Sequence, residues 1–530
     1  MKIDPKKIQD AFNNKTPEEK DMLLGELGLK NRSTSQDEKC AKETRVSQYN
    51  YSKKSENNKG SSNPQSSRFP LTDLGNAKRL VAKHGADIRY CHSQSDWYIW
   101  NGRHWEKDDT GEIVRRAKDT VQSIQKEAKC PSLSEKQKKA LLNHARLCEN
   151  KSKIYSMITL AQSEEGIPIR IQELDKDPML FNVENGTLNL NDGNIYPHNR
   201  KDKLSKISPV VYDNNAECPT WLSFLEKIMD GDQEIIGYLQ RVLGYSLTGL
   251  VTEQKFWFLF GSGANGKSTF LETLSYILGD YCKTTPMETF MRKNSEGVPN
   301  DIADLKGARF VTANETELGR QFAESKMKHL TGGETVKARF LFKEFFEFVP
   351  QFKIFIAGNH KPIIKETKDA IWRRLRLIPF TVRIQDHEKD DKLIDKLKSE
   401  ASGISNWLVK GCLLWQSEGL NCPESVMQVT EAYRQEMDVV QSFVNDCCTV
   451  HPQLKDSAAN LYDCYIGWAN DKGEYTLSQK AFGTNLREKG YTQKTINGRS
   501  HWQGLKVKRE VFQNLINIKE GLSNKSRYYR

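Results

Sequence analysis

The sequence has no long hydrophobic run. None of its segments approaches the roughly 18 consecutive apolar residues of a membrane span, and the first residues, Met1 to Lys7, have no apolar signal core. The eleven cysteines lack the paired spacing of a zinc site, and the adjacent Cys447 and Cys448 are poorly placed to bridge each other. We therefore expect no membrane partner, buried thiols in a reducing compartment, and a cytoplasmic location, in a bacterial host.

Neither sign of charge is in large excess. The 80 Lys and Arg residues against 69 Asp and Glu give a net charge of +11, which suits a polyanionic partner such as nucleic acid but is weak evidence alone. A hydrophobic fraction of 37% and ten tryptophans exclude a wholly disordered chain. At 530 residues the chain has room for roughly three domains.

Large aliphatic residues are nearly absent from residues 31–68, which are rich in Ser, Asn, Lys and Gln. Such a segment buries too little apolar surface to offset the entropy of ordering, so we predict a disordered linker. Residues 1–30 predict a short helical segment, because Thr16 can cap a helix and Pro17 suits its first position.

Residues 69–220 predict an α+β domain. Aromatic residues flank the turn signal Asn101-Gly102, which predicts a β-hairpin. Residues 112–165 have a helical composition, and residues 180–196 alternate as short strands around Asn-Gly and Asp-Gly turns.

The clearest motif is a glycine-rich loop between a strand-like run, residues 256–260, and a helix-like segment that starts near Thr269. Glycines let backbone N–H groups surround a β-phosphate, Lys267 can reach the β- and γ-phosphates, and the Ser268 hydroxyl can ligate Mg²⁺. The alternative, an ordinary glycine-rich turn, leaves the lysine unexplained. We therefore expect ATP and Mg²⁺ as cofactors. The predicted nucleotide-binding residues are Gly261, Ser262, Gly263, Ala264, Asn265, Gly266, Lys267, Ser268 and Thr269.

Two later strand-like runs end in polar residues. The run 309–313 leads to Glu315, a candidate general base for the attacking water and a candidate ligand of Mg²⁺. The run 353–357 leads to Asn359, whose amide can sense the γ-phosphate. In a parallel α/β sheet, the carboxyl ends of strands present ligand groups at one edge. The alternatives are a solvated loop carboxylate and a turn asparagine before a proline.

A basic run follows, with Arg373 and Arg374 at its centre. An arginine that one subunit projects into the nucleotide site of the next stabilises the charge of the transition state. Either residue is a candidate arginine finger, although such a run is also typical of a solvated or salt-bridged face.

The order of these motifs resembles that of the superfamily 3 helicases, within the phage- and plasmid-type primase-helicase group that includes poxvirus enzymes. The resemblance extends over much of residues 69–520 and includes Thr72 to Ala77, Asn185-Gly186, Gly244-Tyr245, Leu330 to Gly333, Gly358-Asn359 and Trp372 to Arg374. It implies the α/β fold of an AAA+-like P-loop ATPase core, which we place at residues 221–400, and a homo-hexameric ring. Catalytic roles then fall to Lys267, Glu315 and Asn359 with an arginine finger. Many members have an acid where this chain has Asn314, so Mg²⁺ would rest mainly on Ser268, phosphate oxygens and water.

The resemblance also implies a DNA-gripping hairpin between Glu315 and Asn359. Residues 335–340 alternate polar with apolar, and residues 345–349 can form the returning strand. Lys337 on the first strand and Lys343 at the tip are candidate DNA contacts. The alternative is a sheet edge that carries solvated lysines.

Residues 401–530 predict helices around Tyr433, 461–468 and 478–489, followed by a strand pair. This order resembles the winged-helix module found at the end of many members of the family. The segment from Arg499 to the C-terminus has eight basic and two acidic residues. Candidate DNA contacts are Lys480, Arg487, Lys494 and Arg499. A helical lid with a solvated tail is the alternative.

We therefore expect an ATP-dependent, ring-forming DNA helicase that unwinds DNA during replication of a phage, plasmid, virus or other mobile element. Its expected partners are single-stranded DNA in the ring channel, an origin duplex at the C-terminal domain, and a separate primase or polymerase. We expect no primer synthesis, because the 68 residues before Phe69 are mostly low-complexity. Two alternatives stay open: a non-hydrolysing, ATP-dependent origin-binding initiator, and a P-loop ATPase that translocates RNA or remodels a partner.

Overall fold

The structure is a computed structural model that describes residues 69–293, 300–314, 320–341, 344–366 and 369–510. The predictions for residues 1–30 and 31–68, and those for Glu315 and Lys343, lie outside the described residues. The chain divides into two compact units, one of residues 1–68 with 129–135 and the other of residues 69–128 with 136–530. In the described part of the first unit, the Leu133 amide donates to the Cys130 carbonyl, which forms a turn.

The second unit starts with helices around a three-stranded antiparallel sheet, ordered β1-β2-β3. The hairpin predicted around Asn101-Gly102 is confirmed, because Trp100 of β2 pairs with Trp105 of β3. The helices predicted in residues 112–165 are also present. The elements are α4 (Asp73–His84), β1 (Ile88–Cys91), β2 (Asp96–Trp100), β3 (Trp105–Lys107), α5 (Glu112–Glu127), α6 (Glu135–Cys148) and α7 (Lys151–Ala161).

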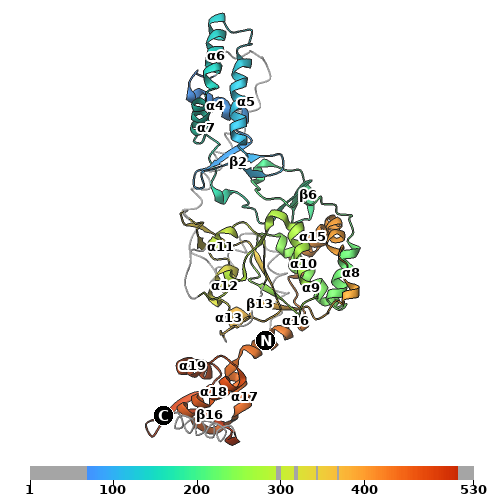
Figure 1. The fold of residues 1–530 in the computed structure, drawn as a ribbon, viewed down its shortest axis with the longest axis vertical. Coiled ribbons are helices and arrows are strands. Elements are labelled where there is room, and N and C mark those ends of the chain that lie inside the picture. The colour runs from blue at the N-terminus through green and yellow to red at the C-terminus, as the bar shows by residue number, and fades with distance from the viewer. Residues whose placement is uncertain (1–68, 294–299, 315–319, 342–343, 367–368, 511–530) are drawn as a thin grey trace, which may run out of the picture. The chain divides into compact units, whose positions relative to one another are not determined.

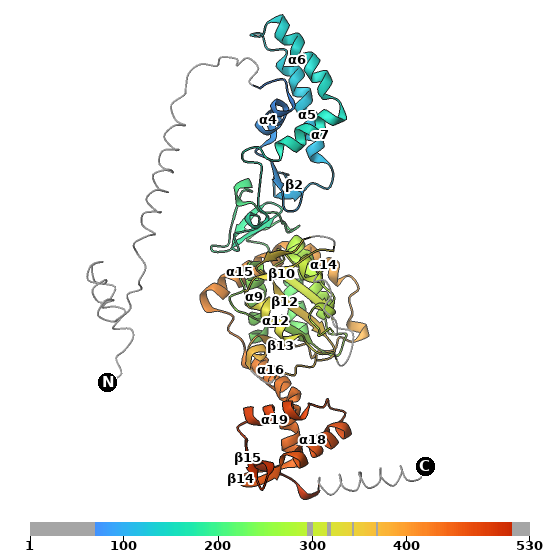
Figure 2. The same ribbon diagram turned by 90° about the vertical axis from the view of Figure 1, so that its left-hand side faces the viewer.

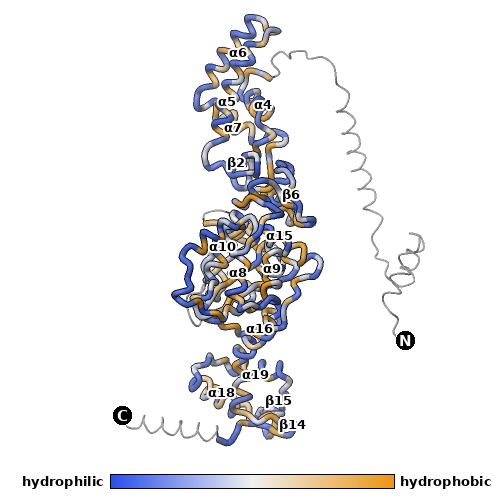
Figure 3. The backbone as a smooth tube through the Cα atoms, turned by 90° about the vertical axis from the view of Figure 1, so that its right-hand side faces the viewer, coloured by the Kyte–Doolittle hydropathy of each residue, from blue (hydrophilic) through white to orange (hydrophobic). Residues whose placement is uncertain are grey.

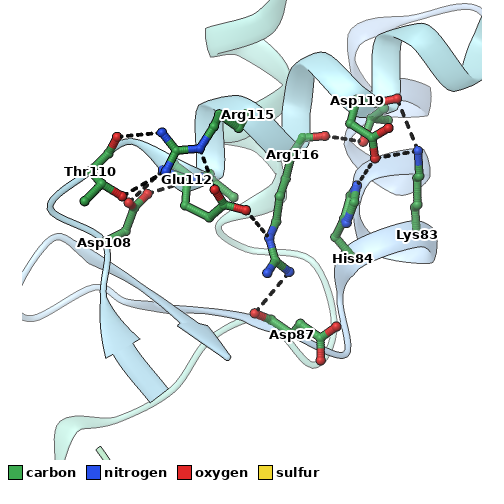
Figure 4. Close-up of polar contacts among 11 residues, drawn as sticks. Lys83, His84, Asp87, Asp108, Thr110, Glu112, Arg115, Arg116 and Asp119 are labelled. Atoms are coloured by element: carbon green, nitrogen blue, oxygen red, sulfur yellow. Dashed lines mark hydrogen bonds and ion pairs between the residues drawn. The ribbon is translucent and has the colours of Figure 1, made fainter. Parts of the chain in front are cut away.

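Polar contacts fix the start of α5 and join it to α4 (Figure 4). The Asp108 carboxylate accepts the backbone N–H groups of Glu112 and Ile113, at 2.7 and 2.9 Å, so it caps the helix. Asp119 of α5 lies 2.6 Å from the Lys83 ammonium and 3.1 Å from the ring of His84, both on α4. Asp119 thus pairs with two residues of α4, which indicates a structural role.

A second three-stranded antiparallel sheet confirms the short strands predicted in residues 180–196. Its first strand is joined to the rest of the unit, since the backbone N–H of Asn182 donates to the Tyr281 hydroxyl at 3.1 Å. The elements are β4 (Leu180–Val183), β5 (Gly186–Asn189) and β6 (Asn194–Tyr196), with 3₁₀ turns at Ile171–Glu173 and Arg200–Asp202.

A five-stranded sheet forms the centre of the unit, with the order β13-β7-β12-β9-β8 and every neighbouring pair parallel. The chain is therefore a mixed α/β protein with a parallel sheet, as predicted. Its apolar runs are continuous rather than alternating because both faces of the sheet are covered. The strands are β7 (Phe256–Phe260), β8 (Cys282–Thr284), β9 (Phe310–Asn314), β12 (Lys353–Gly358) and β13 (Leu375–Pro379).

Helices cover the two faces of this sheet separately (Figure 1). Trp257 and Leu259 point to the face covered by α8, α9, α10 and α15, whereas Phe256 and Phe258 point to the face covered by α11, α12 and α13. The helices are α8 (Pro219–Ile228), α9 (Gln233–Leu247), α10 (Lys267–Leu278), α11 (Asn300–Asp304), α12 (Glu324–Thr331), α13 (Asp369–Trp372), α14 (Leu393–Ser399) and α15 (Ala401–Glu418), with 3₁₀ turns at Gly279–Tyr281, Met287–Thr289 and Asp386–Glu388.

Helix α15 follows the boundary that we predict at residue 400, yet it shares a hydrophobic core with α9 of the central region. The two helices approach closely, because a Cβ at Gly244 would lie 2.1 Å from the backbone nitrogen of Cys412. Figure 3 shows hydrophobic residues in the segments around α8, α9 and α15. The domain boundaries themselves stay predictions.

The hairpin predicted between residues 335 and 349 is present. Strands β10 (Val336–Ala338) and β11 (Phe346–Phe348) pair antiparallel, with Ala338 opposite Phe346. Alternation places Val336, Ala338 and Phe348 in the core of this face of the molecule.

After a leading helix, α16, the last region has the order α17, β14, α18, α19, β15, β16. Figure 2 shows α18 and α19 with β14 and β15 of this region. Its sheet is antiparallel with the order β14-β16-β15, and Phe443, Tyr465, Phe482 and Trp502 form its core. The predicted helices and strand pair are present, and β14 is additional. The elements are α16 (Glu424–Met437), α17 (Val439–Cys447), β14 (Cys448–Ser457), α18 (Ala458–Lys472), α19 (Gln479–Glu488), β15 (Thr492–Ile496) and β16 (Arg499–Val507). None of the described helices is both long and apolar enough to cross a membrane.

Candidate functional site

The glycine-rich loop between β7 and α10 has a backbone that needs its glycines. Gly263 and Gly266 have φ values of +97° and +84°, and Ala264 between them has +49°. A Cβ at Gly266 would lie 2.6 Å from Cγ2 of Ile228, and one at Gly261 would lie 2.2 Å from Nδ2 of Asn265. Successive left-handed residues ahead of a helix N-terminus turn backbone N–H groups toward a common centre, which suits an anion.

Lys267, at the first position of α10, is held inside this loop. Its ammonium donates to the carbonyl of Gly261 at 2.7 Å, to Oδ1 of Asn265 at 3.0 Å and to Oδ1 of Asn359 at 3.3 Å. The residue is 7% exposed, and burial lowers the pKa of Lys267 to about 8. These three oxygens carry no formal charge, so the buried ammonium has a strong affinity for an incoming anion.

The carboxyl edge of the sheet brings together part of the predicted catalytic set. β12 ends beside β7, which puts Asn359 within hydrogen-bonding distance of Lys267. β9 ends at the same edge, with Asn314 opposite Ala357 of β12. Glu315, the next residue, lies outside the described residues, so its predicted role is untested.

The donor set around the loop fits a nucleotide with its metal ion. Ser268 and Ser262 are exposed, Thr269 is half-buried, and the Ser268 hydroxyl lies in the first turn of α10. Within the described ranges, no three His, Cys, Asp or Glu side chains converge on a common point. A divalent ion there would therefore depend on few protein ligands, as expected for Mg²⁺ that keeps waters and binds through phosphates.

The two candidate finger arginines lie in different environments. Arg374 is buried, 8% exposed, and its Nη1 donates to the Thr331 hydroxyl at 3.3 Å. Burial and then the neighbouring charge of Arg373 lower the pKa of Arg374. Arg373 is exposed and lines a surface groove with Arg376 and Arg434. Of the two, Arg373 has the side chain that can reach another molecule.

Arg373 cannot reach the loop of its own chain. β13 runs parallel to β7 with Leu375 opposite Phe256, and the Lys255 ammonium donates to the Arg373 carbonyl at 2.5 Å. Arg373 therefore lies at the amino edge of the sheet, whereas the loop follows the carboxyl end of β7. The strand has five residues, so the two edges are roughly 16 Å apart.

The candidate nucleic-acid contacts occur in two regions of the chain, the β10–β11 hairpin and the C-terminal region. Lys337 is exposed on β10, and Lys343 lies outside the described residues. Two residues that the motifs did not single out accompany Lys337: the Arg339 guanidinium lies 4.6 Å from the centre of the Phe345 ring, and the Lys337 ammonium 5.1 Å from it. The alternation of residues 335–340 was the available signal for this pairing.

In the C-terminal region, Lys480 and Arg487 are exposed on α19, Lys494 on β15 and Arg499 at the start of β16. Lys480 and Arg487 are seven positions apart and so share one face of α19. Arg487 donates to Oε1 of Gln493 at 2.8 Å, which fixes the helix to the hairpin of β15 and β16. Arg487 of the helix therefore contacts the hairpin directly.

Three protein families match successive parts of the chain. Residues 77–230 match the family described as D5 N terminal like, residues 259–374 match a family of unknown function (DUF5906), and residues 435–518 match the family described as Poxvirus D5 protein-like.

Curated viral proteins are similar to more than half of the chain. "Putative helicase L207/L206" of Acanthamoeba polyphaga mimivirus is 33% identical over 336 residues, which cover 58% of this chain and 34% of that protein. "Putative helicase 121R" of Invertebrate iridescent virus 3 is 24% identical over 332 residues, which cover 56% and 35%. The chain thus spans about a third of the length of these relatives. Among solved structures, the apo C-terminal region of NrS-1 is similar to this chain, with a TM-score of 0.45 and 13% sequence identity. The match covers 82% of this chain and 99% of that structure.

Proposed function

The chain belongs to the D5-like family of superfamily 3 primase-helicases, and on that premise we propose that it is an ATP-driven DNA helicase. The observation that carries the proposal is the Lys267 ammonium, buried in a glycine-rich loop, whose partners among the described residues are three uncharged oxygens, of Gly261, Asn265 and Asn359. An ammonium in that position is prepared for the phosphates of a nucleotide. The relatives' names and viral sources support a role in replicating a virus or other mobile element.

Each residue at the carboxyl edge has a separate task in this proposal. The loop backbone and Lys267 bind the β- and γ-phosphates, and Ser268 holds Mg²⁺. Bound Mg·ATP supplies the phosphoryl group and the metal charge that the reaction needs. Asn359 contacts Lys267 before nucleotide binds, so a phosphate that draws the ammonium away changes this contact and reports the occupied state. Glu315 orients and deprotonates the attacking water.

The active assembly is a ring, proposed as a homo-hexamer, in which Arg373 acts on the neighbour's nucleotide. Its position at the amino edge, far from its own loop, supports action in trans. Head-to-tail contacts of one chain close into rings, and such a ring gives every site an arginine from the next subunit.

DNA binding is assigned to two surfaces. The β10–β11 hairpin with Lys337 contacts single-stranded DNA in the channel. The C-terminal region has the element order of a winged helix, with α19 as recognition helix and the β15–β16 hairpin as wing, and it contacts duplex DNA through Lys480, Arg487, Lys494 and Arg499. A separate primase or polymerase completes the proposed partners.

ATP hydrolysis measured with and without single-stranded DNA tests the proposal, for the wild type beside Lys267→Ala and Glu315→Gln. We expect DNA to stimulate turnover, Lys267→Ala to lose ATP binding, and Glu315→Gln to bind ATP without hydrolysing it. A wild type that binds ATP but has no turnover on any DNA would refute the helicase and favour a non-hydrolysing initiator. Turnover stimulated only by RNA or a protein partner would favour a translocase or remodelling ATPase.

Mixing two inactive variants tests action in trans. Lys267→Ala keeps its arginine and Arg373→Ala keeps its nucleotide site, so random mixing of equal amounts rebuilds about a quarter of the interfaces. Recovered ATPase activity is the expected result. An inactive mixture that nevertheless assembles into rings contradicts the assignment of Arg373.

A further inference from the structure

The exposed face of the β10–β11 hairpin holds an aromatic ring next to two cations. Phe345 is 48% exposed, and the Arg339 guanidinium and the Lys337 ammonium lie 4.6 and 5.1 Å from its ring centre. Both distances are within the range of cation–π attraction. The ring is therefore held at the surface by the cations rather than by burial in the core.

The strand register explains why these three residues share one face. Lys337 lies opposite Glu347, and Ala338 lies opposite Phe346. Because side chains alternate along a strand, Lys337 lies on the face away from the core, whereas Val336 and Ala338 lie in the core. Arg339 and Phe345 lie just beyond the paired residues, and the contacts of both cations with the Phe345 ring place them on the Lys337 side. The hydrophobic core thus accounts for one face of the hairpin and leaves Phe345 without a role in it.

A second aromatic pair fixes the hairpin beneath this face. Phe340 stacks on Phe346 with ring centres 5.7 Å apart, and the Lys306 ammonium lies 5.0 Å from the Phe346 ring. Phe346 is half-buried and belongs to the side packed against the core. The platform that displays Phe345 is accordingly anchored to the central region.

The charges beside Phe345 determine whether this face suits the phosphates or the bases of a nucleic acid. Glu347 lies opposite Lys337 and Glu344 precedes the ring, and both carboxylates are exposed. These two anions lower the net positive charge that a phosphate meets on this face. A base is uncharged, and it can stack on an aromatic ring whose other neighbours are cations.

We propose that Phe345, positioned by Arg339 and Lys337, is a stacking platform for bases of single-stranded DNA. This inference rests on the proposed function and adds the mode of contact: the hairpin binds bases through their faces, without sequence preference, in addition to phosphates. Stacking of this kind is worth about 1–3 kcal/mol per base. At 1.4 kcal/mol per tenfold change, that corresponds to about 5- to 140-fold in affinity.

Two oligonucleotides of equal length test the platform in the full chain. One is ordinary single-stranded DNA, and the other has abasic sugars, so it keeps the phosphates but has no bases. Fluorescence anisotropy gives the affinity of the wild type, Phe345→Ala and Phe345→Trp. Val349→Ala is the matched control, because Val349 is also apolar and 51% exposed just beyond the same strand.

We expect Phe345→Ala to weaken binding of ordinary DNA by about 5- to 140-fold and to leave binding of abasic DNA unchanged. Phe345→Trp should keep the wild-type affinity for ordinary DNA, and Val349→Ala should change the affinity for neither oligonucleotide. An equal loss on both oligonucleotides, or none on either, overturns the platform. A loss of affinity that sedimentation traces to failed assembly of the subunits also overturns the platform, since Phe345 would then belong to a contact between subunits. A wild type that binds abasic and ordinary DNA equally refutes only the platform, whereas one that binds neither refutes the proposed function.

Discussion

Raising the pH above 8 is expected to weaken ATP binding. Burial lowers the pKa of Lys267 to about 8 in the ligand-free protein, from an ordinary value of 10.5. The ammonium is therefore mostly charged at pH 7 and mostly neutral at pH 9, whereas bound phosphates favour the charged form. Above pH 8, binding must take up a proton.

The magnitude follows from the same pKa. One unit above it, about one molecule in eleven has a charged Lys267, so the affinity for Mg·ATP at pH 9 is about tenfold lower than its plateau. Each further unit costs another factor of about ten until the pKa of the bound state is reached. The stability of the fold depends on pH in the opposite direction. Because the charged form is disfavoured in the fold, stability of the ligand-free protein rises between pH 8 and 10.5.

Isothermal titration calorimetry between pH 7.5 and 9.5, in buffers of different ionisation enthalpy, measures both the affinity and the protons taken up. Lys267→Met is the control, and its binding should be weak and independent of pH. A wild-type affinity that is flat across this range, or a Lys267→Met protein with the wild-type slope, would refute the reasoning.

Five further substitutions, which test three separate predictions, have expected outcomes. Arg373→Ala should lower kcat by at least about 10³-fold without changing ATP affinity. Arg374→Ala should lower the free energy of unfolding by about 1–3 kcal/mol in urea denaturation. A stable Arg374→Ala protein with the lower kcat, beside a destabilised Arg373→Ala protein, would exchange the two roles. Gly266→Ala should abolish ATP binding, because the added Cβ would overlap the Ile228 side chain. The control is Gly490→Ala, at φ +90° in open space, which should lower the free energy of unfolding by about 1 kcal/mol and leave ATP binding intact. Equal ATP binding by both variants would contradict the need for glycine in the loop. Lys494→Gln should reduce the salt dependence of duplex DNA binding by about one unit of slope, and an unchanged slope would remove Lys494 from the DNA surface.

The sequence predicted those features whose signal is local. The apolar runs before Gly261 and Asn359 formed the expected neighbouring strands, because the buried parallel sheet requires continuous hydrophobic residues. The hairpin at residues 335–349 was likewise predictable from alternation, since one of its faces packs on the core.

Features that depend on long-range packing were not predictable. Strand β14 contains Pro452 and mostly exposed polar residues, so its sequence does not resemble a strand, and only pairing with β16 creates it. Adjacent arginines have the same local signal, and only the fold makes Arg374 buried and Arg373 exposed. The same applies to Arg309, whose burial depends on the carbonyls of Leu247 and Leu180, far away in the sequence.

The central claim is that ATP hydrolysis by a ring of these chains separates DNA strands. The most direct measurement is displacement of a labelled strand from a forked duplex, with ATP and with a non-hydrolysable analogue, by the wild type and by Arg373→Ala. We predict displacement by the wild type with ATP alone, and none with the analogue or with Arg373→Ala. A wild type that binds the fork and hydrolyses ATP but leaves the duplex intact would contradict the claim.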